Sequence, residues 1–206
     1  MEEKKENFLK RVSKRFGNLL VLVITMLVLF VFFSIRSPYF LKINNMLNLL
    51  QQTCVLGLVS AGITLIILAG SLDLSVGSIL ALSGIFGAFF IKYTDSWMIG
   101  FLGGILVGTI AGALNATMIT ILKMNPLIVT LGMSTVWEGV TKLLNNGTAI
   151  GIFNDDFKKI GQGRFLGIPI VIFIMAVVYI LLIVFLKYTK FGREAYAVGG
   201  NAKSAK

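Results

Sequence analysis

The residues best suited to polar chemistry lie in a short break between two apolar stretches. Residues 68–83 read LAGSLDLSVGSILALS. Gly70 is suited to end one helix, and Asp73 or Ser75 is suited to cap the next. Helix ends at membrane depth expose unpaired backbone groups, which are tolerated only where protein or a water-filled cavity satisfies them. The break is therefore either a pair of caps at the membrane surface or part of a pathway for a polar solute.

A second polar break occurs at Asn125 and Pro126, where Pro126 takes the favoured first position of a helix. Four polar side chains then recur at intervals of four and share one helical stripe: Thr130, Ser134, Glu138 and Lys142. The last two have the spacing and order of an ion pair, which would lower the free-energy cost of both charges in a membrane. We expect simple pairing near the outer interface in preference to a functional carboxylate.

Several chemistries have no motif in this sequence. There is no G-x-x-x-x-G-K-[ST] for ATP, no GxSxG, no HExxH and no histidine, and Cys54 is the one cysteine. We therefore expect no cofactor, no metal site and no catalytic residue. Any ATP hydrolysis must belong to a separate subunit.

The rest of the chain is apolar enough to have the bilayer as its main solvent. Of its 206 residues, 56% are hydrophobic and 14% are charged. Six stretches approach the length of about 20 apolar residues that crosses a membrane. They lie near 19–35, 46–69, 76–91, 97–122, 126–144 and 168–186. We predict an all-α polytopic protein with one transmembrane domain over residues 1–206. The 76–91 stretch is the shortest, and whether it crosses fully is left open.

One stretch, 97–122, carries a glycine at every fourth position: Gly100, Gly104, Gly108 and Gly112. This spacing keeps the glycines on one helix face, where another helix can approach closely. We predict that these residues serve helix packing. Asn115, in the same stretch, either bonds across helices, which we favour, or meets a hydroxyl of a solute.

The distribution of charge sets an expected orientation. The chain has a formal net charge of +10, and most of its 19 Lys and Arg residues fall on one side if residues 1–18 are cytoplasmic and six spans follow. The positive-inside rule then puts both termini in the cytoplasm and explains the basic charge without nucleic acid. Residues 145–167 form an outer segment, either a solvated loop or a cap over a pathway. Residues 187–206 form a basic cytoplasmic tail.

Three segments together resemble a known family: AGSLDLSVGSILALSG, NPLIVTLGMSTVWEGVTKLLNNGTAI and KFGREAYAVGGNAKSA. They are similar to the ribose/xylose-type permeases of bacterial ABC importers, a broad group that includes branched-chain amino-acid permeases. The resemblance implies a subunit of the bacterial plasma membrane that translocates a monosaccharide such as ribose. It implies three protein partners besides the lipid bilayer: a cytoplasmic ABC ATPase, an extracytoplasmic sugar-binding protein and a second permease subunit, so that the permease is a homodimer.

The resemblance also assigns sites. It places the D-L-S-V-G-S pattern in the membrane core, which makes Asp73, Ser75, Gly77 and Ser78 pathway candidates. To these we add three polar residues from the neighbouring stretches: Asn115, Asn125 and Thr130. It makes residues 187–206 a coupling loop for the ATPase, with Phe191, Gly192, Glu194, Gly199, Gly200 and Asn201 as its matching residues. The family commonly has a basic residue where this chain has Glu138, so no family role is carried onto that position. The family pattern continues past Lys206, and we expect a permease truncated at its C-terminal end.

Other functions remain open at this point. A permease for branched-chain amino acids or nucleosides would differ only in its substrate. A secondary transporter would couple to ions through an intramembrane carboxylate, for which only Glu138 and Asp73 could serve. A non-transporting truncated membrane fragment would bind no partner subunits. Dependence on an ATPase separates the importer from the secondary transporter, and co-purifying partners separate it from the fragment.

Overall fold

The computed structural model describes residues 2–201, with side chains for residues 19–200. Six helices of this part are long and apolar enough to cross a membrane, which confirms the predicted all-α polytopic fold. The chain divides into two units, Met1–Leu50 and Gln51–Lys206, with the division inside α2 (Ile43–Leu68). The side chains of the predicted basic segment 1–18, and all of residues 202–206, lie outside the described part.

The first unit holds α1 (Glu2–Arg36) and the start of α2. The turn between these helices is closed by aromatic packing: the ring of Phe40 lies 5.3 Å from that of Phe30 and 5.8 Å from that of Phe33. The side chain of Asn45 donates a hydrogen bond of 2.8 Å to the carbonyl of Phe40. The apolar side chains of α1 from Leu19 onward are exposed, as suits a helix surrounded by lipid.

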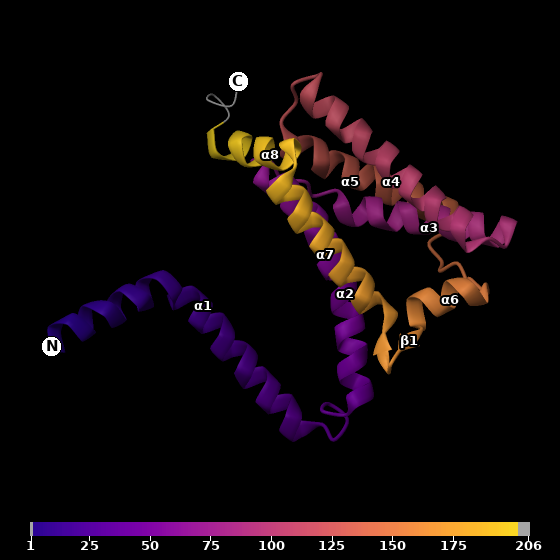
Figure 1. Ribbon diagram of the computed structural model, residues 1–206. Coiled ribbons are helices and arrows are strands. Elements are labelled where there is room, and N and C mark those ends of the chain that lie inside the picture. The colour runs from indigo at the N-terminus through magenta and orange to yellow at the C-terminus, as the bar shows by residue number, and fades with distance from the viewer. Residues whose placement is uncertain (1, 202–206) are drawn as a thin grey trace. The chain divides into compact units, whose positions relative to one another are not determined.

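The second unit is built around α3 (Val76–Thr94), α4 (Trp97–Thr120) and α5 (Pro126–Asn145), which lie side by side (Figure 1). At 19 residues α3 rises about 28 Å, enough to span most of the hydrocarbon. Asp95, with a φ of 51°, and Ser96 make the turn between α3 and α4. A two-residue turn forces these helices to run antiparallel.

The glycine face of α4 meets α3 at three of its four positions. A Cβ added to Gly104 would lie 3.1 Å from the carbonyl oxygen of Ser83, and one added to Gly108 would lie 2.8 Å from the Ser83 hydroxyl. At Gly100 it would lie 2.8 Å from the carbonyl oxygen of Gly87. At Gly112 it would meet no described atom within 4 Å. The small residues therefore let the helices approach closely along most of the stripe, and a space opens at its last member.

The segment after α5 contains α6 (Asp155–Gln162) and a hairpin of β1 (Arg164–Phe165) and β2 (Ile168–Pro169). The side chain of Asn154 caps α6 by accepting from the amide of Phe157 at 2.9 Å, and it donates to the carbonyl of Asp95 at 2.9 Å. This segment was predicted as a solvated loop or a cap. It is ordered and is tied to the α3–α4 turn.

Charged pairs cover the surface of α6. Lys159 lies 2.9 Å from Asp156, and Lys158 lies 3.6 Å from Asp155. The hydrogen bond and the charge of Asp156 raise the pKa of Lys159 above its ordinary value. All four side chains are at least two-fifths exposed, so solvent screens the pairs and they contribute little to stability.

The last two helices are α7 (Ile170–Tyr188) and α8 (Lys190–Asn201). The hydroxyl of Tyr179 on α7 donates to the carbonyl of Gly57 on α2 at 3.0 Å, and Met175 also lies against that glycine. Figure 1 shows α8 turning away from the axis of α7. The segment predicted as a coupling loop is thus helical from Lys190 to Asn201, a difference that reflects its packing against other helices.

The fit between α3 and α4 can be tested at Gly104. Gly104→Val should lower the free energy of unfolding by about 1–3 kcal/mol, because its side chain would press on the α3 backbone at Ser83 and push the two helices apart. The measurement is the unfolding midpoint of the detergent-solubilised chain. Gly132→Val is the matched control, since a Cβ there meets no described atom within 4 Å. Equal midpoints for the two variants would contradict close α3–α4 packing.

Candidate functional site

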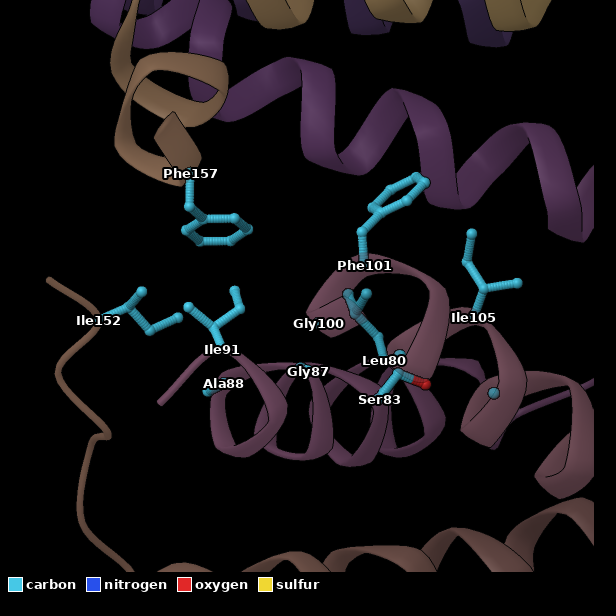
Figure 2. A pocket seen from close by; sticks show the side chains of 13 residues that line it. Leu80, Ser83, Gly87, Ala88, Ile91, Gly100, Phe101, Ile105, Ile152 and Phe157 are labelled. Carbon is cyan, nitrogen blue, oxygen red and sulfur yellow. The ribbon is translucent and has the colours of Figure 1, made fainter. Parts of the chain in front are cut away.

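One cavity in the second unit is apolar. It has a volume of about 410 Å³ and lies between α3 and α4, with Ile152 and Phe157 facing it from the segment after α5 (Figure 2). Among its described lining residues, Ser83 contributes the one side-chain oxygen. A polar solute would lose its hydrogen bonds to water here and gain almost none. This cavity therefore does not suit a polar substrate.

A second cavity, which we call the polar cavity, lies at the break between α2 and α3 and has a volume of about 240 Å³. It collects residues from the end of α2, the break, α4 and α5. The lining is Ile66, Ser71, Leu72, Asp73, Gly112, Asn115, Ala116, Ile119 and Thr130. The structure thus brings together Asp73, Asn115 and Thr130, three predicted pathway residues that are up to 57 positions apart in the chain.

A hydrogen-bonded cluster holds the break in place beside this cavity. The backbone amide of Ser75 donates to Asp73 Oδ1 at 2.7 Å, and the Ser75 hydroxyl donates to the same oxygen at 2.6 Å. Asn115 Nδ2 donates to Ser75 Oγ at 2.7 Å. Ser75 is fully buried, and Ser78 Oγ donates to its carbonyl at 2.8 Å. The start of α3 is therefore fixed by side chains of the break and of α4.

Two buried polar side chains beside the cavity are poorly satisfied. Asn115 is 2% exposed, and its Oδ1 has no hydrogen-bond partner among the described atoms. Thr130 is 1% exposed, and its hydroxyl makes only a long contact of 3.5 Å to the carbonyl of Leu127. A buried acceptor without a donor costs about 1–3 kcal/mol, so a ligand or water that donates here would be favoured. The cavity is suited to a solute with hydroxyl groups.

The charge of the lining limits the solute further. None of the described lining residues is Lys or Arg, and Asp73 is the one acid among them. A solute with a carboxylate would meet a like charge and no partner, which opposes its entry. A neutral polar solute avoids both costs.

The other predicted pathway residues lie around this cavity or apart from it. Gly77 is exposed on the first turn of α3, and Ser78 lies on the same turn without lining the cavity. Asn125 is exposed, and its Oδ1 accepts from the amide of Leu127 at 2.9 Å, so it caps α5. The lining also includes Ser71, which sequence reasoning did not select although it lies in the same break. Gly112, predicted for packing, faces the cavity three residues before Asn115, a spacing that shares one helix face.

The predicted ion pair on α5 is confirmed. Lys142 Nζ lies 2.6 Å from Glu138 Oε1, and both side chains are more than half exposed. Neither residue lines the polar cavity. The pair satisfies both charges locally and leaves Glu138 without the free carboxylate that an ion-coupled carrier would need.

The predicted coupling residues divide into two groups on α8. Phe191 is 71% exposed, and the exposed Glu194 lies 3.6 Å from Lys190. In contrast, Gly192 is buried against the end of α7, and Gly199, although exposed overall, lies against the end of α2 on one side. A Cβ on Gly200 would meet no described atom within 4 Å. The backbone of Asn201 ends α8, and its side chain lies outside the described part.

The polar cavity lies at the end of the helices that faces α8. Because α2 to α5 alternate in direction, the α2–α3 break and the α4–α5 connection share one end, and the α3–α4 turn lies at the other (Figure 1). Gly199 contacts the α2 terminus at the first end, while Asn154 bonds to Asp95 at the second. α8 and the segment after α5 therefore contact opposite ends of the helices.

Comparison with known proteins identifies similar chains. A ribose import permease of Bacillus subtilis is 39% identical over 207 residues, covering 99% of this chain and 62% of the relative. An L-arabinose ABC transporter permease of Azospirillum brasilense is 36% identical over 89% of this chain and 54% of its own length. A D-allose transport system permease of Escherichia coli is 32% identical over 93% of this chain and 58% of its own length.

The chain thus spans somewhat more than half the length of these relatives. No solved structure gives a significant match. The family described as the permease component of the branched-chain amino acid transport system matches residues 45–206, which include the break, the polar cavity and α8. This multi-spanning membrane protein therefore belongs to that permease family.

Proposed function

We propose that this chain is part of the membrane permease of an ABC importer that moves a neutral monosaccharide such as ribose across a bacterial plasma membrane. The observation that carries the proposal is the polar cavity between membrane-crossing helices. Its buried acceptor, Asn115 Oδ1, lacks a donor, and its lining offers no positive charge among the described residues. Sugar hydroxyls supply donors and carry no charge, so they match this site.

A neutral sugar is favoured over an amino acid as the substrate for two reasons. The similar permeases described above are named for ribose, L-arabinose and D-allose, which are all simple sugars. An amino acid would bring a carboxylate next to Asp73 without an Arg or Lys to receive it in the described lining. The family name thus describes the wider group, and we assign this chain to a sugar branch of it.

The pathway residues that we propose are those that line or hold the polar cavity: Asp73, Ser75, Asn115 and Thr130. Gly77 and Ser78 form the adjoining turn of α3. A sugar needs only brief hydrogen bonds during passage, because strong binding would slow its release. Sparse hydroxyl and amide groups in an apolar wall meet that requirement.

We propose three protein partners for the complete transporter. An ATPase on the cytoplasmic side would bind α8, where Phe191 and Glu194 are exposed. An extracytoplasmic binding protein would deliver the sugar at the opposite end, and a second permease subunit would complete the pathway. ATP binding would then move α8, and the packed helices would carry that motion to the polar cavity.

The proposed pathway can be tested by replacing Asn115, which lines the polar cavity, and by comparing it with Asn125, which does not. Asn115→Leu should reduce ribose uptake more than about tenfold, because it removes both the donor to Ser75 and the buried acceptor. The assay is uptake of labelled ribose, arabinose and allose by bacteria that lack their own ribose permease and express this chain with its ATPase and binding protein.

The control for this test is Asn125→Ala, which removes the cap of α5. That variant should lose about 0.5–2 kcal/mol of stability and keep the substrate profile of the wild type. Equal uptake by the Asn115 variant and the wild type would contradict the proposed pathway. Absence of uptake even with the wild-type chain would favour the non-transporting fragment.

The ATPase contact can be tested by co-purification from detergent. Phe191→Ala and Glu194→Ala should each weaken recovery of the ATPase, because they remove exposed side chains from the proposed docking face. Glu138→Ala is the matched control: Glu138 is also exposed and also paired with a lysine four residues away, but it lies on α5. If the Glu138 variant loses the ATPase equally, the docking face is not on α8.

A further inference from the structure

The first turn of α8 is attached firmly to the end of α7. The amide of Gly192 donates to Thr189 Oγ1 at 3.1 Å, and that hydroxyl donates to the carbonyl of Phe185 at 2.7 Å. A Cβ on Gly192 would lie 2.6 Å from the Cα of Leu186, which leaves no room for a side chain. α8 is therefore oriented by α7 at its beginning.

The last turn of α8 rests on a different helix. A Cβ on Gly199 would lie 3.0 Å from the carbonyl carbon of Leu68, 3.4 Å from the amide nitrogen of Gly70 and closer still to the Leu68 oxygen. All three are backbone atoms, so they cannot rotate away as a flexible side chain could. Only glycine allows α8 to come this close to the end of α2.

The part of α2 that receives Gly199 is its C-terminal cap. The amide of Gly70 donates to the carbonyl of Ile67 at 2.9 Å, and the amide of Ser71 donates to that of Ile66 at 3.1 Å. Gly70 has a φ of +77°, a conformation that closes a helix and that favours glycine. The contact with Gly199 therefore falls on a turn whose shape is set by these two hydrogen bonds.

This cap is also a wall of the polar cavity. Ile66 and Ser71, the two residues joined by the cap hydrogen bond, both line it. Asp73, two residues further on, lines it as well and holds Ser75 at the start of α3. A displacement of the cap must therefore change the cavity wall, because a few residues of backbone join the two.

We propose that Gly199 is a positioning residue for the polar cavity: its contact with the α2 cap sets the conformation of residues 70–75 according to where α8 lies. The meaning of this link for transport rests on the proposed function. The link itself is a property of the packing and requires neither sugar nor ATPase. A partner that moved α8 would change the site directly at its nearest wall, without a rearrangement of the whole bundle.

The test compares two neighbouring glycines of α8. Gly199→Val should speed hydrogen–deuterium exchange of the backbone amides in residues 71–79 on the order of tenfold, because the cap must open to admit the side chain. This segment contains the amides of Ser75, bonded to Asp73, and of Ile79, bonded to the Ser75 carbonyl. Gly200→Val should leave exchange there within about twofold, since its Cβ meets no described atom within 4 Å.

The measurement uses the full detergent-solubilised chain, with helix content checked by circular dichroism. If Gly199→Val fails to fold, Gly199→Ala and Gly200→Ala replace the pair, and faster exchange in residues 71–79 of the first alone supports the proposal. Unchanged exchange in that segment with either Gly199 variant overturns it. Because the readout needs no sugar, failure here leaves the sugar-uptake test intact, and failure of uptake leaves this test intact.

Discussion

The hydrogen bonds of the α2–α3 break are the constraint on which the second unit depends. Hydrocarbon offers no partners to a helix end, so each amide and carbonyl released there must be satisfied by protein or trapped water. Ser71 and Gly70 close α2, and Asp73 and Ser75 open α3. The bond from Asn115 then ties this break to α4. Because α3 packs on α4 and α5, the direction in which α3 leaves the break sets the directions of these two helices as well.

The stripe of glycines on α4 changes its role along one helix face. At Gly100, Gly104 and Gly108 the missing side chains let the α3 backbone and the Ser83 hydroxyl come close to α4. At Gly112 the α3 chain has given way to the break, so the missing side chain leaves a space that Asn115 faces. A continuous small-residue pattern thus allows close helix approach along most of its length and borders the polar cavity at its last member.

The sequence predicted the features that depend on local rules. Six spans follow from apolar length, the start of α5 from Pro126, and the Glu138–Lys142 pair from its spacing. It did not predict that α8 is helical, because three glycines in 12 residues lower helix propensity, and packing against α7 and α2 overcomes this. The burial of Thr130 and the contact of Gly199 join distant segments, which no local pattern reveals. Asn125 caps α5, as its position before a helix start favours, and its part in the pathway stays a prediction.

The second unit combines a tightly packed helix pair with a cavity whose polar groups are incompletely hydrogen-bonded. The α3–α4 contact is backbone against backbone, and such packing resists gradual deformation. The polar cavity is different, because it keeps a buried acceptor without a donor among the described atoms and is bounded by the short C-terminal cap of α2. A free-energy change of about 1–3 kcal/mol, the cost of one unmet buried acceptor, is comparable to the coupling energy between sites in allosteric proteins. The proposed link from Gly199 therefore acts on a cavity wall where a free-energy change of this size would alter what a solute meets.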